Sequence, residues 1–194
     1  MTTTIGILLA AGAGRRMGGP KALVIGEDGL AWVVSGARTL AAGGCVETVV
    51  VVGADESAVR QLLTEEPVTI VSAGDWESGM GASLRAGLRA VADRRADSAL
   101  VHLVDLPDVG PEVIRRLVAR ASPDVLARAR YGPPAGHPVL LGREHWAAIA
   151  DECTGDSGAR AYLARHEVDE VDCSDLATGA DVDRRTPATA KAER

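Results

Sequence analysis

Thr4-Ile-Gly-Ile-Leu-Leu-Ala-Ala-Gly-Ala-Gly-Arg-Arg-Met-Gly-Gly-Pro-Lys21 joins a short apolar run to a glycine-rich loop. An apolar run of strand length without polar alternation is typical of a strand covered on both faces, as in parallel sheets. Small residues that directly follow such a strand lie at the sheet edge where α/β proteins bind their ligands. The stretch therefore predicts the first strand of a parallel sheet, followed by a binding loop.

The rest of the chain repeats this alternation of strand and helix. Further apolar runs of strand length occupy 47–52, 68–71 and 99–104, and a strand at 125–129, an extended piece at 137–141 and a short strand at 168–171 are also expected. Apolar residues at helical spacing occupy 30–42, 56–63, 82–92, 112–121, 143–150 and 158–165. The alternation predicts an α/β fold, a single-domain three-layer α/β/α arrangement with a mostly parallel central sheet, over residues 1–183. Residues 184–194 have nothing to bury and are expected to form a flexible tail.

Composition excludes several classes of protein. The 194 residues carry a net charge of -6, and only 3% are aromatic, so a protein that coats nucleic acid is excluded. The sequence has no apolar stretch long enough to span a membrane, and no basic region precedes the N-terminal apolar run. The three cysteines, Cys45, Cys153 and Cys173, have no metal-binding spacing. A cytoplasmic protein with reduced thiols is expected.

The glycine-rich loop has the composition of an anion site. Its backbone N–H groups can approach phosphate oxygens closely, and three cations accompany them: Arg15, Arg16 and Lys21. It is not the dinucleotide fingerprint, because Met17 stands where the third glycine belongs. It is not a P-loop either, because Pro20 separates the last glycine from Lys21. The alternative is an ordinary flexible turn.

Other candidate positions each have a structural alternative. Asp105 ends an apolar strand at the edge where the loop lies, which suits Mg²⁺, but it could instead cap a turn. Residues 78–84 open a helix, and their backbone N–H groups could bind a ligand, or the segment could be a plain N-cap. His137 stands between Gly136 and Pro138 and is not assigned as a base. Three further residues are assigned to packing: His102, Met17 and Met80.

Five segments, in this order, resemble the signatures of the MobA-like nucleotidyltransferases. They are Leu8–Lys21, Trp76–Leu88, Val104-Asp-Leu-Pro107, Gly136-His-Pro-Val139 and Gly155-Asp-Ser-Gly-Ala-Arg160. The resemblance covers about residues 4 to 183 and is strongest to the molybdenum cofactor cytidylyltransferase branch. It departs where the family usually has Ser and this chain has Gly14, and where Val104 replaces a glycine. The family's C-terminal Asp-x-Asp-Thr-Pro is also altered, because Arg184 and Arg185 separate Asp183 from Thr186.

The resemblance implies a Rossmann-like fold of the nucleotide-diphospho-sugar transferase type and an Mg²⁺-dependent enzyme. The implied reaction transfers CMP from CTP to the phosphate of a molybdopterin-type cofactor and releases pyrophosphate. Lys21 and Arg16 would contact the phosphates, and Asp105 with Asp183 (or Asp181 in its place) would hold the metal. His137 would lie on the acceptor side. Nucleotide binding would involve Leu9, Ala10, Ala11, Gly12, Gly14, Gly18, Gly79 and Ser83.

Three alternatives stay open from the sequence. The first is transfer from GTP or another nucleoside triphosphate to a different phosphorylated acceptor, such as a sugar or alcohol phosphate. The second is a non-catalytic nucleotide-binding module. The third, a dinucleotide-binding oxidoreductase, is disfavoured by the glycine spacing and because no acidic residue directly ends the second strand, where Asp55 comes too late. The sequence identifies no partner that would deliver the cofactor.

Overall fold

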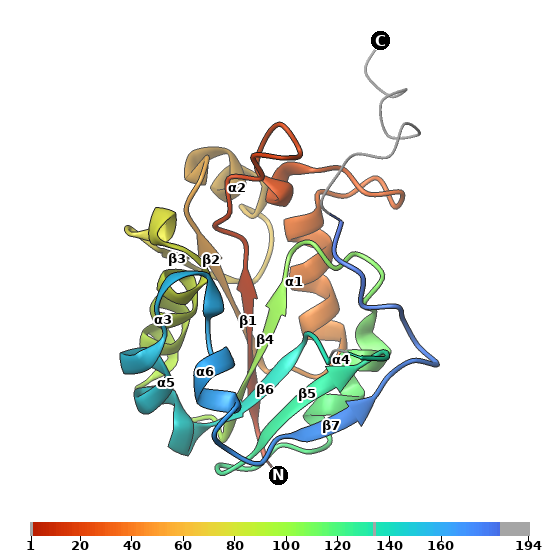
Figure 1. The fold of residues 1–194 in the computed structure, drawn as a ribbon. Coiled ribbons are helices and arrows are strands. Elements are labelled where there is room, and N and C mark those ends of the chain that lie inside the picture. The colour runs from red at the N-terminus through yellow and green to blue at the C-terminus, as the bar shows by residue number, and fades with distance from the viewer. Residues whose placement is uncertain (1, 134, 183–194) are drawn as a thin grey trace.

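The structure is a computed structural model that describes residues 2–133 and 135–182 (Figure 1). Seven strands form one sheet: β1 (Thr4–Leu9), β2 (Glu47–Val52), β3 (Thr69–Ser72), β4 (Ser98–Leu103), β5 (Leu126–Arg130), β6 (Val139–Gly142) and β7 (Asp169–Asp172). The helices are α1 (Trp32–Ala42), α2 (Glu56–Leu62), α3 (Met80–Val91), α4 (Pro111–Val118), α5 (Trp146–Glu152) and α6 (Arg160–Leu163). Short 3-10 turns occur at η1 (Lys21–Leu23), η2 (Trp76–Ser78), η3 (Arg143–His145) and η4 (Gly155–Ser157).

The sheet has the order β3-β2-β1-β4-β6-β5-β7 and is mostly parallel, as the sequence predicts. Strand β1 pairs in parallel with β2 and with β4, and β7 pairs in parallel with β5. Strand β6 alone among the described strands runs against its neighbours, antiparallel to both β4 and β5. The sequence predicts an extended piece here but not its direction. The antiparallel direction follows from the connection, because a short loop and no crossover helix joins β5 to β6.

Helices cover both faces of the sheet (Figure 1). On one face, α1 lies against β1 and α4 against β5 and β6, in a core that contains Leu8, Leu40 and Ile114. On the other, α3 lies against β1 and α5 packs against α3, in a core that contains Ile7 and Leu88. Neighbouring residues of β1 therefore face opposite cores, which explains why the strand is apolar at every position. The predicted three-layer arrangement is confirmed.

The topology creates a crevice between the carboxyl ends of β1 and β4. From β1 the chain passes to β2 and β3 on one side, and from β3 it crosses through α3 to β4 on the other side of β1. At such a switch point the connections leave in opposite directions, so a crevice opens between them. Leu9 pairs with Leu103, so the glycine-rich loop and Asp105 leave the sheet at the same level.

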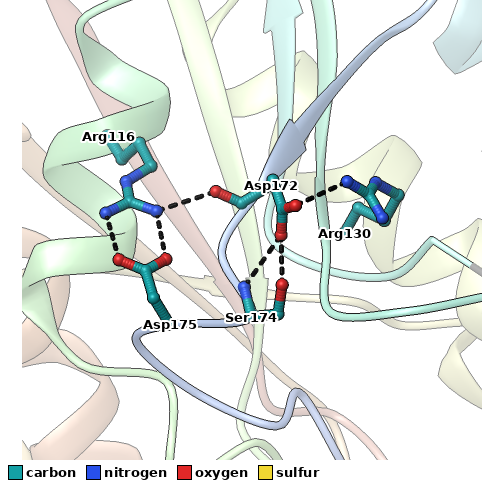
Figure 2. A network of polar contacts seen from close by, with 5 residues as sticks. All are labelled: Arg116, Arg130, Asp172, Ser174 and Asp175. Atoms are coloured by element: carbon teal, nitrogen blue, oxygen red, sulfur yellow. Dashed lines mark hydrogen bonds and ion pairs between the residues drawn. The ribbon is translucent and has the colours of Figure 1, made fainter.

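A polar network ties the segment after β7 to α4 and β5 (Figure 2). Arg116 of α4 donates to both carboxylate oxygens of Asp175, at 2.6 and 2.9 Å, and to the backbone oxygen of Asp172. Arg130 of β5 donates to the Asp172 carboxylate at 2.6 Å, and Ser174 also binds this carboxylate. The bidentate Arg116 contact fixes the direction in which the chain leaves the sheet.

Beyond this network the segment returns to the crevice. Thr178 donates its backbone N–H to the Asp108 carboxylate at 2.7 Å, and the backbone N–H of Val182 donates to the backbone oxygen of Asp105 at 3.0 Å. Asp108 therefore holds a distant segment. The last described residue, Val182, lies beside Asp105.

The expected tail, residues 184–194, lies outside the described residues. In the part of the chain that the structure describes, no helix has the length and apolar character needed to cross a membrane.

Gly87 sets the distance between α3 and the sheet, and its replacement tests the packing. A Cβ atom at this position would lie 2.7 Å from Cγ2 of Ile7 and 3.2 Å from Cγ2 of Val51. We expect Gly87→Val to lower the free energy of unfolding by about 1–3 kcal/mol, because the added methyls overpack a buried interface. Urea denaturation measures the change. Arg89→Val is the matched control on the exposed side of α3, with an expected loss below about 0.7 kcal/mol. Equal losses would contradict this packing account.

Candidate active site

A pocket of about 400 Å³ opens at the crevice between β1 and β4. The glycine-rich loop, the residue after β4, the start of α3 and turn η4 all contribute to it. Its lining consists of Leu9, Ala11, Gly12, Ala13, Gly14, Arg15, Lys21, Trp76, Glu77, Gly79, Met80, Ser83, Leu103, Val104, Asp105 and Asp156. The glycine-rich loop thus forms a wall of a nucleotide-sized cavity.

The glycine-rich loop folds back on itself at Gly14. The Gly14 carbonyl oxygen accepts hydrogen bonds from the backbone N–H of Met17 at 2.8 Å and of Gly19 at 3.3 Å. Gly14 has φ +55°, and a Cβ atom there would lie 2.0 Å from the Gly19 oxygen. The loop as folded therefore requires glycine at position 14. A serine, which the resembled signature has at this place, would need a different path between residues 14 and 19.

Lys21 and Asp105 form an ion pair at the mouth of the pocket. The Nζ atom of Lys21 donates to Oδ2 of Asp105 at 2.8 Å, and the two side chains are 15% and 20% exposed. Pro20 and turn η1 place Lys21, and the end of β4 places Asp105. Among the described residues, the hydrogen bond to the Asp105 carboxylate comes from the Lys21 side chain and not from a backbone N–H of the turn. The pair brings the cation and the carboxylate that the sequence singles out for phosphate and for metal to one point.

The start of α3 forms the opposite wall. Gly79 has φ +113°, and a Cβ atom there would lie 2.6 Å from Oδ1 of Asp156. This close approach presses turn η4 against α3 and brings Asp156 to the pocket. Ser83 is buried, whereas Met80 is 37% exposed and lines the cavity. The assignment of Met80 to packing is therefore wrong, while Met17 and His102 are buried as expected.

The structure brings most of the candidate nucleotide-site residues together. Leu9, Ala11, Gly12, Gly14, Lys21, Gly79, Ser83 and Asp105 all line the pocket. Three do not: Ala10 is fully buried in the core beside α1, and Arg16 and Gly18 lie on the exposed part of the loop. Asp183 lies outside the described residues, and Asp181 is exposed.

Trp76, Glu77 and Asp156 are among the lining residues that were not assigned to the site from the sequence. The signal was available, because they stand inside the tryptophan and Gly-Asp segments of the resemblance. Trp76 also covers Gly53, where a Cβ atom would lie 2.5 Å from its Cγ. Trp76 therefore fills the space after β2.

A second pocket of about 290 Å³ adjoins the first, and both are lined by Leu9, Met80, Leu103 and Asp156. His137, the candidate residue on the acceptor side, lines the second pocket, as do Arg128 and Arg160. Burial lowers the pKa of His137, and a hydrogen bond with the Val101 backbone and the charge of Asp105 oppose this shift. The imidazole is therefore neutral at pH 7.

Carboxylates outnumber cations around the first pocket. Glu77, Asp105 and Asp156 line it together with Arg15 and Lys21. A triphosphate brings about four further negative charges near neutral pH, so the lining alone leaves excess negative charge. Within the described ranges no group of three or more His, Cys, Asp or Glu residues could hold a metal ion. One carboxylate with phosphate oxygens and water is, however, a usual set of Mg²⁺ ligands.

The switch-point crevice, the glycine-rich loop that ends in Lys21 and the facing Asp105 define a nucleotidyltransferase-type α/β protein. Comparison with known proteins agrees. The chain belongs to the MobA-like NTP transferase family, whose model matches residues 6–171. The family assignment makes it a nucleotidyltransferase-family enzyme.

Relatives share the fold over nearly the whole chain. The chain is 40% identical over 188 residues to nicotine blue oxidoreductase of Paenarthrobacter nicotinovorans, covering 92% of this chain and 91% of the relative. A Methanothermobacter nucleotidyl transferase has a TM-score of 0.82 at 20% identity, covering 95% and 93% of the two chains. The manganese complex of Rv0371c from Mycobacterium tuberculosis has a TM-score of 0.72 at 27% identity, covering 88% of each chain.

Gly14→Ala tests the folded form of the loop. The methyl group has no room beside the Gly19 oxygen, so we expect the loop to open and the affinity for a nucleoside triphosphate to fall at least about tenfold. Gly12→Ala is the matched control, because a Cβ atom at Gly12 meets nothing within 4 Å. Isothermal titration of both variants with CTP and GTP measures the effect. Equal affinities in the two variants would show that the turn at Gly14 does not shape the site.

Proposed function

We propose that the protein transfers CMP from CTP to the phosphate of a molybdopterin-type cofactor, in an Mg²⁺-dependent reaction that releases pyrophosphate. The observation that carries this proposal is the Lys21–Asp105 pair at the switch point, in the pocket that the glycine-rich loop also lines. In nucleotidyl transfer the protein mainly holds the triphosphate, offsets its charge and positions the nucleophile. The order and identity of the five sequence segments favour the cytidylyl branch.

Lys21 and the glycine-rich loop would hold the triphosphate. The ammonium group of Lys21 donates a hydrogen bond to Asp105 at 2.8 Å. A small side-chain movement would exchange this partner for a phosphate oxygen. Arg15 lines the same pocket and adds a second positive charge. These groups oppose the negative charge that develops on the phosphate chain as pyrophosphate leaves.

Asp105 would be the first metal ligand, and Asp183 the second. The Asp105 carboxylate suits a cation, since it already binds one, the Lys21 ammonium group, at 2.8 Å. Asp181 is the alternative second ligand, since its neighbour Val182 donates a backbone N–H to the Asp105 backbone oxygen. When bound, Mg²⁺ would draw charge from the phosphate oxygens and orient the triphosphate. The related manganese complex of Rv0371c supports a divalent cation in this family.

The acceptor would enter through the second pocket. This pocket shares residues with the first, so a molecule seated there can present a phosphate to the α-phosphorus. A phosphate monoester is already anionic at neutral pH, so no general base is needed. His137, neutral in its covered position, would contact the acceptor without removing a proton.

Pyrophosphate release tests the proposal. The protein is incubated with Mg²⁺, each nucleoside triphosphate in turn, and molybdopterin-type cofactor or a sugar or alcohol phosphate. Release with CTP and the molybdopterin-type cofactor supports the proposed reaction. Release only with GTP, or only with another acceptor, would replace the substrate and keep the reaction class. Binding of triphosphate without release in any combination would favour a non-catalytic module.

Removing the charge of Asp105 should abolish metal-dependent turnover. Asp105→Asn keeps the shape of the side chain, and we expect a fall of roughly two to three orders of magnitude in kcat, with little change in melting temperature. Turnover measured against Mg²⁺ concentration checks this. Asp108→Asn is the matched control on the same turn, where the carboxylate holds Thr178 and does not line the pocket. Normal activity and normal Mg²⁺ dependence in Asp105→Asn would contradict the metal assignment.

Ala11 should contribute to the choice of base. Its side chain lines the pocket, and its backbone oxygen accepts a hydrogen bond from Ala54 at 3.0 Å. We expect Ala11→Gly to lower the preference for CTP over GTP by at least about fivefold, since one methyl group in a pocket contributes about 1–3 kcal/mol of discrimination. Competition between the two nucleotides measures it. Ala10→Gly is the control, because Ala10 faces the core. Unchanged preference in Ala11→Gly would mean that other residues select the base.

A second candidate function is that of an oxidoreductase that uses a nicotinamide dinucleotide and acts on a dye such as nicotine blue. The relative of 40% identity, named nicotine blue oxidoreductase, favours it. Against it, Trp76 fills the space after β2, where a dinucleotide's ribose would contact an acidic residue. Consumption of NADH or NADPH at 340 nm with a quinonoid dye tests this candidate. Consumption that requires the dye, with no pyrophosphate released from any triphosphate, would replace the transferase proposal.

A further inference from the structure

Tyr131, the residue that follows β5, contacts two segments of the chain that lead to the two pockets. Its hydroxyl group donates to the backbone oxygen of His137 at 3.0 Å. Its ring lies against Gly179, where a Cβ atom would lie 2.1 Å from Cδ2 of Tyr131. Tyr131 is not among the residues that line either pocket, so it can act on a ligand only through these two segments.

The hydroxyl group of Tyr131 holds the β5–β6 loop. Gly136 and His137 of this loop line the second pocket. A Cβ atom at Gly136 would meet nothing within 4 Å, so no side chain packs against the loop at this place. The Gly136 N–H donates to the Ala129 oxygen at 2.9 Å, and the Tyr131 hydroxyl fastens the next residue. The path of the loop at the second pocket therefore depends on these two hydrogen bonds.

The aromatic ring of the same side chain supports the segment after β7, residues 173–182. Hydrogen bonds fasten this segment on both sides of the ring contact. Thr178 donates its N–H to the Asp108 carboxylate at 2.7 Å. The N–H of Val182 donates to the backbone oxygen of Asp105 at 3.0 Å. The segment thus passes the ring immediately before it reaches the proposed metal ligand.

Gly179 lies between these two hydrogen bonds. It has φ +63°, a conformation that glycine adopts without strain. The ring of Tyr131 also occupies the place that a side chain at position 179 would need, so any larger residue would push the segment or the ring away. The contact therefore fixes how closely the segment approaches Tyr131 on its way to Asp105.

We propose that Tyr131 is a positioning residue for the transfer reaction: its hydroxyl group holds the β5–β6 loop, and its ring holds the segment that reaches Asp105. The inference rests on the proposed function in that it takes the second pocket as the acceptor site and Asp105 as the metal ligand. It adds a residue that joins the two through contacts within the chain. Loss of the hydroxyl group should affect the acceptor alone, whereas loss of the whole ring should affect both acceptor and metal.

Amide hydrogen exchange, followed by NMR on the full chain, tests the two contacts without any turnover. The N–H of Gly136 reports on the β5–β6 loop, and the N–H of Val182 reports on the segment after β7. We expect Tyr131→Phe to raise the exchange rate of Gly136 about three- to tenfold, because one hydrogen bond is lost, and to leave that of Val182 within about twofold. Tyr131→Leu also removes the ring, so we expect both rates to rise at least about threefold.

Gly179→Ala tests the ring contact from the other side. The added methyl group has no room beside the ring, so we expect the exchange rate of Val182 to rise about tenfold or more. Gly29→Ala is the matched control, because Gly29 also has a positive φ, +77°, but a Cβ atom there meets nothing within 4 Å. We expect it to leave both rates within about twofold. This comparison decides the matter where Tyr131→Leu does not fold.

Each of three results would overturn the inference. The first is exchange of the Val182 N–H in the wild-type protein at the rate of an unfolded chain. The second is an unchanged Gly136 rate in Tyr131→Phe. The third is an effect of Gly179→Ala on Val182 that is no larger than the effect of Gly29→Ala.

Kinetics separate this inference from the proposed function. Where transfer occurs, Tyr131→Phe should raise the KM for the acceptor at least about threefold and leave the Mg²⁺ concentration for half-maximal turnover unchanged. Tyr131→Leu should raise both. Exchange changes as expected, without pyrophosphate release from any triphosphate, would reject the transferase proposal and keep the two contacts of Tyr131. Transfer with normal acceptor KM and normal Mg²⁺ dependence in Tyr131→Leu would keep the transferase and reject the positioning role.

Discussion

The pairing of β1 with β4 is the constraint on which the rest of the structure depends. Leu9 pairs with Leu103, and just beyond them Val104 donates its backbone N–H to the Leu9 oxygen at 3.2 Å. On the other side, the N–H of Ala10 donates to the oxygen of Val51 at 2.9 Å. The loop after β1 is thus held between two neighbouring strands as it leaves the sheet. A shift of one residue in either register would turn Asp105 or the start of the loop toward the opposite face.

Small residues allow the helices to lie close enough to close the site. A Cβ atom at Gly6 would lie 3.1 Å from the side chain of Leu40 in α1, and one at Gly36 would lie 3.1 Å from Leu8 in β1. Gly87 has the same effect on the opposite face. Because the chain contains no Phe, aliphatic side chains fill both layers, and the helices approach the sheet at these glycines. The close approach of α3 brings its first turn over the end of β1, where it forms the pocket wall.

Local patterns in the sequence account for the fold and for the first pocket. The apolar runs predict β1 and β2 at their observed bounds, and the loop and Asp105 follow from their places after strands. The direction of β6 and the second pocket could not be predicted in this way. Arg128 pairs with Glu170, 42 residues further on, so this ion pair depends on strand order. Met80 was misassigned because helical spacing does not distinguish a buried position from one at a pocket beside the helix start.

Both pockets hold a cation in the same manner. Lys21 is paired with Asp105 and Arg128 with Glu170, and each partner comes from a different part of the sheet. Such a pair lets a cation stay partly covered without an uncompensated charge. A ligand must then compete with a resident carboxylate, so a single weak anion gains little, whereas a triphosphate that brings several charges gains much more. In a chain of net charge -6, these two pairs place positive charge at the pocket walls. Local positive charge at a pocket is therefore compatible with a negative net charge of the whole chain.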